Sequence, residues 1–341
     1  MLNKKVMKII LVIMGALIGA GFASGKEIYI FFARFGLNGI IGIFISAIFT
    51  GFVIYCCLNI IGNNKICNGI EFANEIKENK LLYQILNAFL LILFYIMIAG
   101  FSSYFKQEFN INVYITSAIL CIILYFILIN KIVGIITVST IILPVLIIII
   151  LYIAIKYNIV NENEKIMSNN LIICVINAIL YSSYNSILLI PILITLEKYV
   201  ESKKEKIMVS SITSILIIIL TMGLYGILVK SNSEISNIEI PVISILDNKI
   251  EKYLYSISIE IAIITSAIVA GYGVLDNLNE NIKSNSIKYK KVIAVMCLAG
   301  IPISGIGFGN LINTMYPLFG GLGLIQIMLI FQNKLEKKRK N

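Results

Sequence analysis

The chain has 341 residues, of which 59% are apolar and only 13% are charged. This composition excludes an ordinary water-soluble globular protein. The absence of histidine excludes Ser-His-Asp hydrolysis and HExxH zinc chemistry, and the six cysteines form no CxxC pair, so we expect neither an enzyme nor a resident cofactor.

Ten segments are apolar and long enough to suggest a crossing of a hydrocarbon layer, which takes about 20 residues in a helix. In chain order they are 6–34, 37–61, 81–105, 113–129, 132–155, 170–198, 206–229, 253–275, 290–306 and 308–331. The apolar stretch of the first continues past Gly25 towards the second, unlike a cleaved signal peptide. The sequence therefore predicts an all-α integral membrane protein with ten transmembrane helices.

The basic residues indicate the orientation of these spans. With the N-terminus in the cytoplasm, the inner segments hold 20 of the 28 lysines and arginines, the outer segments hold seven, and Lys26 lies within the first span. This is the positive-inside distribution. We expect both termini on the cytoplasmic side of a bacterial plasma membrane, with a basic tail at 332–341. The net charge of +10 thus reflects topology in a lipid bilayer, and nucleic-acid binding loses its support.

The outward connection 156–169 divides the ten spans into two sets of five, 6–155 and 170–331. Because five is odd, the second set enters the membrane from the opposite side. The chain 1–341 is thus expected to form one transmembrane domain with a 5+5 inverted repeat. Transporters of this architecture place their substrate near the midplane, between discontinuous helices.

The first span has the composition of an interrupted helix. Four glycines, one serine and two charged residues fall within it: Gly15, Gly19, Gly21, Ser24, Gly25, Lys26 and Glu27. Each glycine weakens a helix by about 1 kcal/mol. Close packing of small residues is the alternative explanation, but it does not require charges that cost about 2.5–3.5 kcal/mol each at the bilayer centre.

Span 6 carries a run of polar residues at the equivalent place, Tyr181-Ser182-Ser183-Tyr184-Asn185-Ser186, followed by Pro191. Such a run suits an unwound link that faces a polar cavity. Serines that bond to their own helix are the alternative. Two breaks at equivalent places would expose half-helix ends, which attract a carboxylate and a cation.

Span 8 presents a possible corner of hard oxygen ligands. Ala262, Thr265 and Ser266 lie within about 100° of one another on a helical wheel, and they suit an alkali cation unless the hydroxyls bond to their own helix. Glu260 lies on the opposite face. A buried acid there must face protein or water rather than lipid, and it is a possible proton site.

The segment Gly19-Ala-Gly21-Phe-Ala-Ser-Gly25-Lys-Glu27 resembles the opening signature of the YkvI-type bacterial membrane proteins. These are relatives of the amino acid, polyamine and organocation transporters with the LeuT-like fold. The resemblance covers nearly the whole chain by span count and is most specific over 15–27. It implies a 5+5 repeat in which spans 1 and 6 are discontinuous and spans 3 and 8 line the site.

The resemblance also implies roles for individual residues. In sodium-coupled relatives the cation lies between span 1 and span 8, so the sodium ligands here would be Gly15, Ile18, Ala262, Thr265 and Ser266. Proton-coupled relatives can replace that cation with a lysine in span 5. Span 5 of this chain, 132–155, has no lysine, which favours sodium as the coupling ion.

For the solute, the same resemblance implies a carboxylate held by the amides around Ala20 to Ala23. The implied substrate-binding residues are Ala20, Gly21, Phe22, Ala23, Ser24, Tyr95, Tyr181, Ser182, Ser183 and Asn185. The expected gating residues are Lys26 outside, Asp276 inside near Lys4 or Lys5, and Glu27. Span 6 differs from familiar members because it lacks glycine.

Together these features predict a secondary transporter that couples sodium to a small zwitterionic solute, such as an amino acid, by alternating access. One alternative is proton-coupled transport or exchange of an organic cation, with Glu260 or Glu27 titrating. Another is a nutrient-sensing membrane subunit that binds without transporting. The sequence makes no prediction about oligomeric state.

Overall fold

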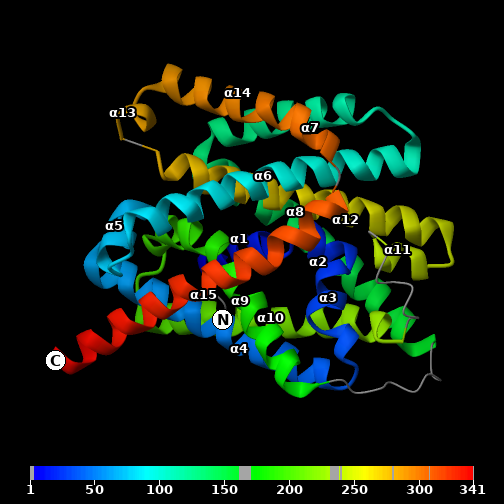
Figure 1. Ribbon diagram of the computed structural model, residues 1–341, viewed down its shortest axis with the longest axis horizontal. Coiled ribbons are helices and arrows are strands. Elements are labelled where there is room, and N and C mark those ends of the chain that lie inside the picture. Colours follow the sequence, from blue (N-terminus) through cyan, green and yellow to red (C-terminus); the bar gives the residue numbers. More distant parts are fainter. Residues whose placement is uncertain are drawn as a thin grey trace.

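Long apolar helices lie side by side along the longest axis of the molecule (Figure 1). The computed structural model describes residues 4–160, 170–230, 238, 240–278, 280–306 and 308–340. Over these ranges all the regular structure is helical, and no strand occurs. The expected all-α class is therefore confirmed.

Seven helices in the described part of the chain are long and apolar enough to cross a membrane. They are α4 (Asn38–Asn64), α6 (Lys80–Phe109), α8 (Lys131–Val160), α9 (Leu171–Glu197), α10 (Lys203–Leu228), α12 (Lys249–Asp276) and α15 (Phe308–Lys340). Two shorter helices, α7 (Val113–Ile129) and α14 (Ser286–Ile303), occupy the fourth and ninth expected spans. The helices thus fall where the hydropathy places them, whereas the count of ten crossings and the 5+5 repeat stay predictions.

Asparagine begins many of these helices. The side chains of Asn79, Asn112, Asn170, Asn248 and Asn285 each accept a backbone N–H of the first turn of the following helix. Such caps satisfy amides that have no partner within the helix. The polar residues between apolar segments therefore fix the helix ends.

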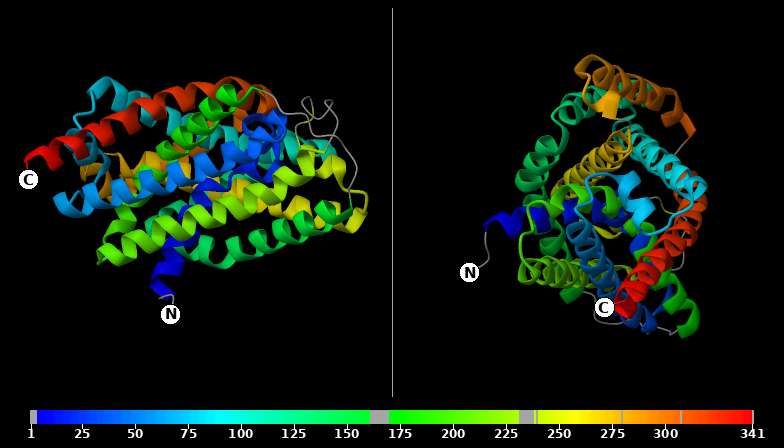
Figure 2. Two further views of the ribbon diagram at one scale, coloured as in Figure 1. Left: turned by 90° about the horizontal axis from the view of Figure 1, so that it is seen from below. Right: turned by 90° about the vertical axis from the view of Figure 1, so that its left-hand side faces the viewer.

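The first expected span is divided into α1 (Lys4–Leu17), α2 (Ala20–Ser24), α3 (Lys26–Phe31) and the short 3-10 helix η1 (Ala33–Phe35). From Ile9 onward α1 is buried in the bundle and contacts α8, α9, α10 and α12, whereas its N-terminal end projects from the side (Figure 2). The divided helix is thus surrounded by continuous ones.

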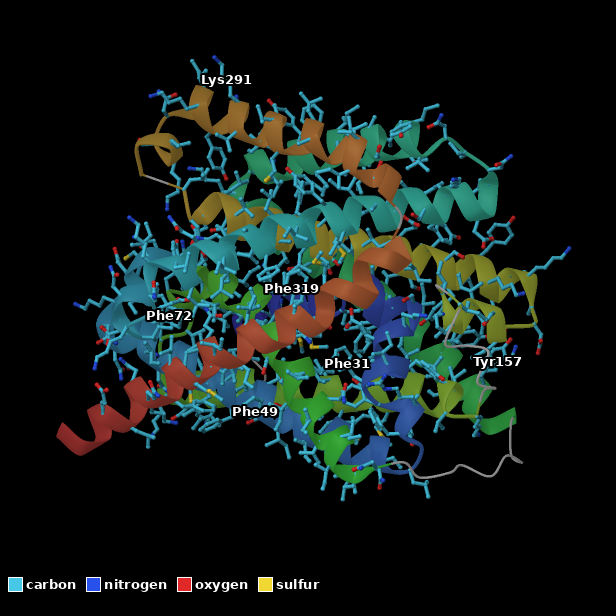
Figure 3. All side chains as sticks on the ribbon, in the orientation of Figure 1. Phe31, Phe49, Phe72, Tyr157, Lys291 and Phe319 are labelled. Atoms are coloured by element: carbon cyan, nitrogen blue, oxygen red, sulfur yellow. The ribbon has the colours of Figure 1, made fainter. Side chains whose placement is uncertain are left out.

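Contacts between the connections define two ends of the bundle. At one end, which we call the basic end, Lys5 pairs with Glu201 and Lys77 pairs with Glu336. The short helices α5 (Gly69–Glu75) and α13 (Glu280–Lys283) lie there, and α11 (Pro241–Ile245) lies at the opposite end (Figure 1). Figure 3 shows Phe72 at the basic end and Tyr157 far from it.

At the opposite end, Glu251 of α12 pairs with Lys156 of α8 and accepts a hydrogen bond from Tyr157 at 2.9 Å. Between the ends, large apolar side chains face outward, including Ile48, Phe126 and Ile141, which are 63–67% exposed. An outer apolar surface of this extent suits contact with lipid.

Candidate functional site

The backbone of the first span is interrupted twice. After α1 ends at Leu17, Gly19 adopts an extended conformation (φ −90°, ψ −175°) and α2 begins at Ala20. Gly25 then takes the left-handed conformation with φ +83° and separates α2 from α3. Glycine adopts this conformation at little cost. The expected interruption of span 1 is therefore present, and the carbonyl of Ile18 lies at the first break.

Span 6 differs from the prediction, because α9 is continuous from Leu171 to Glu197. Ser183 Oγ donates to the Ile179 carbonyl at 2.7 Å, and Asn185 Nδ2 donates to the Tyr181 carbonyl at 2.9 Å. The polar run thus bonds to its own helix, and without glycine the backbone has no inexpensive way to unwind. The predicted discontinuity of helix 6 is wrong.

The structure brings the break in the first span against α12. Ser266 Oγ donates to the Ile18 carbonyl at 3.4 Å. Thr265 Oγ1, one residue earlier, lies 3.0 Å from the carbonyl oxygens of Ile261 and Ala262. Oxygen atoms of both elements therefore meet in the place expected for the cation.

Glycine allows this close approach. A Cβ on Gly19 would lie 3.2 Å from Ser266 Oγ, and a Cβ on Gly15 would lie 3.2 Å from Ser139 Oγ of α8. Ser139 is 2% exposed. Ser139 was not predicted from the sequence, because a single serine in an apolar helix gives no signal of its own.

The helix α2 is held by neighbours on one side. Tyr255 of α12, also missed from the sequence, donates its hydroxyl to the Ala23 carbonyl at 2.7 Å. Ser24 Oγ donates to the Gly21 carbonyl at 3.1 Å. All five residues of α2 are buried. Because α2 has only five residues, its dipole is small, and any anion there would depend on individual amides.

Glu27 is buried between α2 and α9. Its carboxylate accepts a hydrogen bond from the Tyr184 hydroxyl, and a Cβ on Gly21 would lie 2.6 Å from Glu27 Cγ. Gly21 thus leaves room for the acid, which is 2% exposed. Lys26 donates to the Ile238 carbonyl at 2.9 Å. Lys26 and Glu27, both expected as gating residues, are therefore buried and have hydrogen-bond partners.

Aromatic rings close the space between α3 and α9. The Phe31 ring lies 5.3 Å from Tyr181 and 5.8 Å from Tyr184, and Phe32 lies 5.0 Å from Tyr181. Phe31, the last residue of α3, is 3% exposed and is labelled in Figure 3. Ser182 Oγ donates to the Ser46 carbonyl of α4 at 2.8 Å. Tyr181 thus contacts Phe31 of α3, and Ser182 contacts α4.

Three other predicted residues lie apart from the break. A Cβ on Gly300 of α14 would lie 3.5 Å from the Tyr95 ring, so Tyr95 faces α14. Asp276 lines a cavity with Lys131, Tyr272 and other residues of the basic end, whereas Lys5, its expected neighbour, pairs with Glu201. Both carboxylate oxygens of Glu260 are buried and make no hydrogen bond.

These features define a class of protein: an all-helical membrane protein whose divided first helix lies at the centre of continuous ones and meets hydroxyl groups of α12. The fold is similar to that of a manganese transporter from Eremococcus coleocola, crystallised with an aromatic bis-isothiourea substituted compound. The TM-score is 0.52 and the sequence identity 12%, over 96% of this chain and 76% of that one.

Among curated proteins, the chain is 25% identical to the uncharacterized membrane protein YkvI of Bacillus subtilis (strain 168), over 96% of each chain. It is 22% identical to the uncharacterized protein YyaD of the same organism, over the full length of both. No family model matches. The resemblance to YkvI-type membrane proteins that the glycine-rich segment indicates is thereby confirmed.

Proposed function

We propose that the protein is a secondary active transporter that couples sodium to the uptake of a small zwitterionic solute such as an amino acid. The observation that carries the proposal is the meeting of the Ile18 carbonyl at the break with Ser266 Oγ of α12, 3.4 Å apart. In the proposed orientation, the basic end faces the cytoplasm of a bacterial cell.

The spacing of these oxygens suits a monatomic cation. Sodium is close in size to calcium, whose oxygen ligands lie about 2.4 Å away. Two oxygens 3.4 Å apart subtend about 90° at an ion placed about 2.4 Å from each. Adjacent ligands of a six-coordinate ion subtend this angle. Sodium would therefore replace the hydrogen bond from Ser266, with Thr265 one residue away as a further ligand.

A solute site beside the ion is supported by buried polar side chains on α2, α3 and α9. Ser24, Glu27 and Asn185 are each 1–2% exposed, so a solute there would be shielded from both ends. Within the described residues, no group of three or more histidine, cysteine, aspartate or glutamate side chains could hold a metal ion. We therefore favour an organic solute over the manganese carried by the structural relative.

The energetics suit a coupled process. One sodium ion that moves down about 100 mV supplies about 2.3 kcal/mol, and a tenfold sodium gradient adds about 1.4 kcal/mol. The sum of about 3.7 kcal/mol sustains an accumulation of about 500-fold. No chemical step on the solute is required.

The test is uptake of radiolabelled amino acids into proteoliposomes with an inward gradient of sodium or potassium. We expect uptake with sodium only, and we expect Thr265→Ala combined with Ser266→Ala to abolish this dependence. Ser258→Ala is the matched control. Ser258 lies on the same helix, and its hydroxyl donates a hydrogen bond to the Leu254 carbonyl of that helix at 3.2 Å. Equal uptake with potassium, or sodium dependence in the double variant, refutes the proposal, as does binding without flux.

A proton-coupled mechanism is the second candidate, favoured by the two unpartnered carboxylate oxygens of Glu260. A buried acid without a partner at membrane depth is a functional hypothesis by default. Under this mechanism an inward pH gradient drives uptake without sodium, and Glu260→Gln abolishes it. Sodium-driven uptake that persists in Glu260→Gln excludes this candidate.

A further inference from the structure

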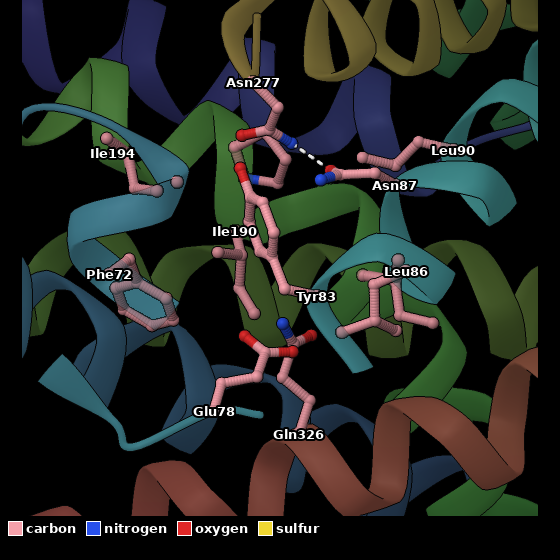
Figure 4. Close-up of a pocket in the computed structure, with 13 residues that line it drawn as sticks. Phe72, Glu78, Tyr83, Leu86, Asn87, Leu90, Ile190, Ile194, Asn277 and Gln326 are labelled. Carbon is pink, nitrogen blue, oxygen red and sulfur yellow. Dashed lines mark hydrogen bonds between the residues drawn. The ribbon is translucent and has the colours of Figure 1, made fainter. Parts of the chain in front are cut away.

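A separate polar cavity lies near the basic end, between the α5–α6 connection, α9, α12 and α15. Its volume is about 30 Å³, and its lining includes Glu78, Tyr83, Asn87, Asn277 and Gln326. Figure 4 shows Glu78 and Gln326 together at one end of the cavity, with Asn87 and Asn277 at the other. None of these residues belongs to the break in the first span.

The local sequence explains why an acid points inward here. Lys77 adopts a left-handed conformation with φ +57° and turns the chain after α5. The Glu78 amide then donates to the Ala73 carbonyl at 2.8 Å, and the side chain is only 9% exposed. On α15, Gln326 is 5% exposed.

Oxygen atoms without partners line this cavity. Glu78 Oε1, Tyr83 Oη, Asn277 Oδ1 and Gln326 Oε1 are buried and make no hydrogen bond. The carboxylate oxygen and the amide carbonyl oxygens among them only accept hydrogen bonds, so they cannot satisfy one another, although the Gln326 side chain also lies within hydrogen-bond reach of the Glu78 carboxylate. Leaving each unpaired costs about 1–3 kcal/mol. A ligand that is positive or donates hydrogen bonds would satisfy them.

Size and charge select among such ligands. A space of about 30 Å³ holds two or three species the size of water, since one needs about 10–15 Å³. Glu78 is the one charged residue in the lining. Asn277 caps the C-terminus of α12, and the negative end of a long helix favours a cation. A site with one carboxylate and otherwise neutral oxygen ligands suits a monovalent cation better than a divalent one.

We propose that this cavity binds a partly hydrated monovalent cation, sodium or potassium, between the Glu78 carboxylate and the Gln326 carbonyl oxygen. The remaining space holds water that reaches Tyr83 and Asn277. The ion connects the start of α6 with α15 beside the end of α12, so its occupancy stabilises the closed basic end. This site is distinct from the proposed coupling site and does not depend on transport.

The experiment measures thermal unfolding of the purified full-length protein against sodium or potassium chloride, with choline chloride holding ionic strength constant at pH 8. The chain has no tryptophan, but five of its six free cysteines are buried, so a thiol-reactive fluorogenic dye reports unfolding. Thr265→Ala with Ser266→Ala serves as the background and removes the proposed coupling site.

In that background we expect sodium or potassium still to raise the unfolding midpoint. Adding Glu78→Gln raises the half-maximal ion concentration at least about tenfold, which is the lower range for a disturbed metal site. Gln326→Leu, which removes a carbonyl oxygen and keeps the bulk, acts likewise and serves if the first variant does not fold. Glu71→Gln is the control, because Glu71 lies on α5 and outside the lining.

Three outcomes overturn the proposal. In the first, the unfolding midpoint of the background variant responds equally to choline and to the alkali cations. In the second, neither cavity substitution changes the dependence of the midpoint on the ion concentration. The third is a midpoint that depends on pH but not on the cation, since a proton on Glu78 then occupies the place of the ion.

Discussion

Replacement of Gly21 by alanine tests the role of the glycine-rich segment. A Cβ there would lie 2.6 Å from Glu27 Cγ and 2.7 Å from Glu27 Cδ, which is well inside van der Waals contact. Glu27 cannot turn away freely, because Tyr184 holds its carboxylate and the side chain is 2% exposed. The substitution must therefore displace the acid.

The expected loss of stability has two parts. Overpacking of a filled interior costs about 1–3 kcal/mol, and a lost hydrogen bond to a charged group costs about 1.5–3 kcal/mol. Together they amount to about 2.5–6 kcal/mol. At about 2 °C per kcal/mol, the unfolding midpoint falls by at least about 5 °C.

The assay is the cysteine-labelling thermal shift, with Gly321→Ala as control. Gly321 lies within α15, and its added Cβ would meet nothing within 4 Å, so alanine there is neutral or stabilises by about 1 kcal/mol. Because the clash needs both groups, Gly21→Ala is harmless once Glu27→Ala is present, a non-additive result. Equal midpoints for Gly21→Ala and Gly321→Ala would refute the reasoning.

Three further predictions follow from the same contacts. Gly25→Ala destabilises by about 1–3 kcal/mol, because Gly25 has φ +83° and its Cβ would lie 2.6 Å from Val242 Cγ2; an unchanged midpoint contradicts this. Ser182→Ala lowers the free energy of unfolding by about 0.5–1.5 kcal/mol, because the hydrogen bond to the Ser46 carbonyl is lost. Chemical unfolding should show a larger loss than for Ser186→Ala, since the Ser186 hydroxyl bonds only within α9 in the contacts described. Burial raises the pKa of Glu78 to about 7 from an ordinary 4.5, so the contribution of Glu78 to stability in choline buffer is greatest below pH 4.5 and falls by about 3 kcal/mol up to pH 7; circular dichroism melts of Glu78→Gln should lack this fall.

The sequence predicted well what depends on local chemistry. Apolar runs placed the helices, and the limits of α7, Val113 and Ile129, agree with the predicted span. Glycines placed the interruption of the first span, because Gly19 and Gly25 adopt conformations that end or turn a helix. Such residues change backbone preferences directly.

The sequence was misleading where two different local conformations satisfy the hydrogen-bonding groups of the same side chains. Ser183 and Asn185 suit a polar cavity, but they also bond to carbonyls four residues earlier in an intact helix. Pro191 lies inside α9 without ending it, as membrane helices permit. Contacts between distant segments, such as Tyr255 with Ala23, have no local signal.

Because α9 is continuous, α1 is left as the helix that can tilt about a single break, the one that follows its last residue, Leu17. Its 14 residues form a rod about 21 Å long, and a tilt of about 10° at Ile18–Gly19 swings the far tip by about 4 Å. In the proposed transport cycle, that travel would separate Lys5 from Glu201, which pair near the tip of α1. Because ion pairs in water hold weakly, this pair would offer little resistance in the proposed transport cycle, and most of the work of opening would fall on the apolar sides of α1.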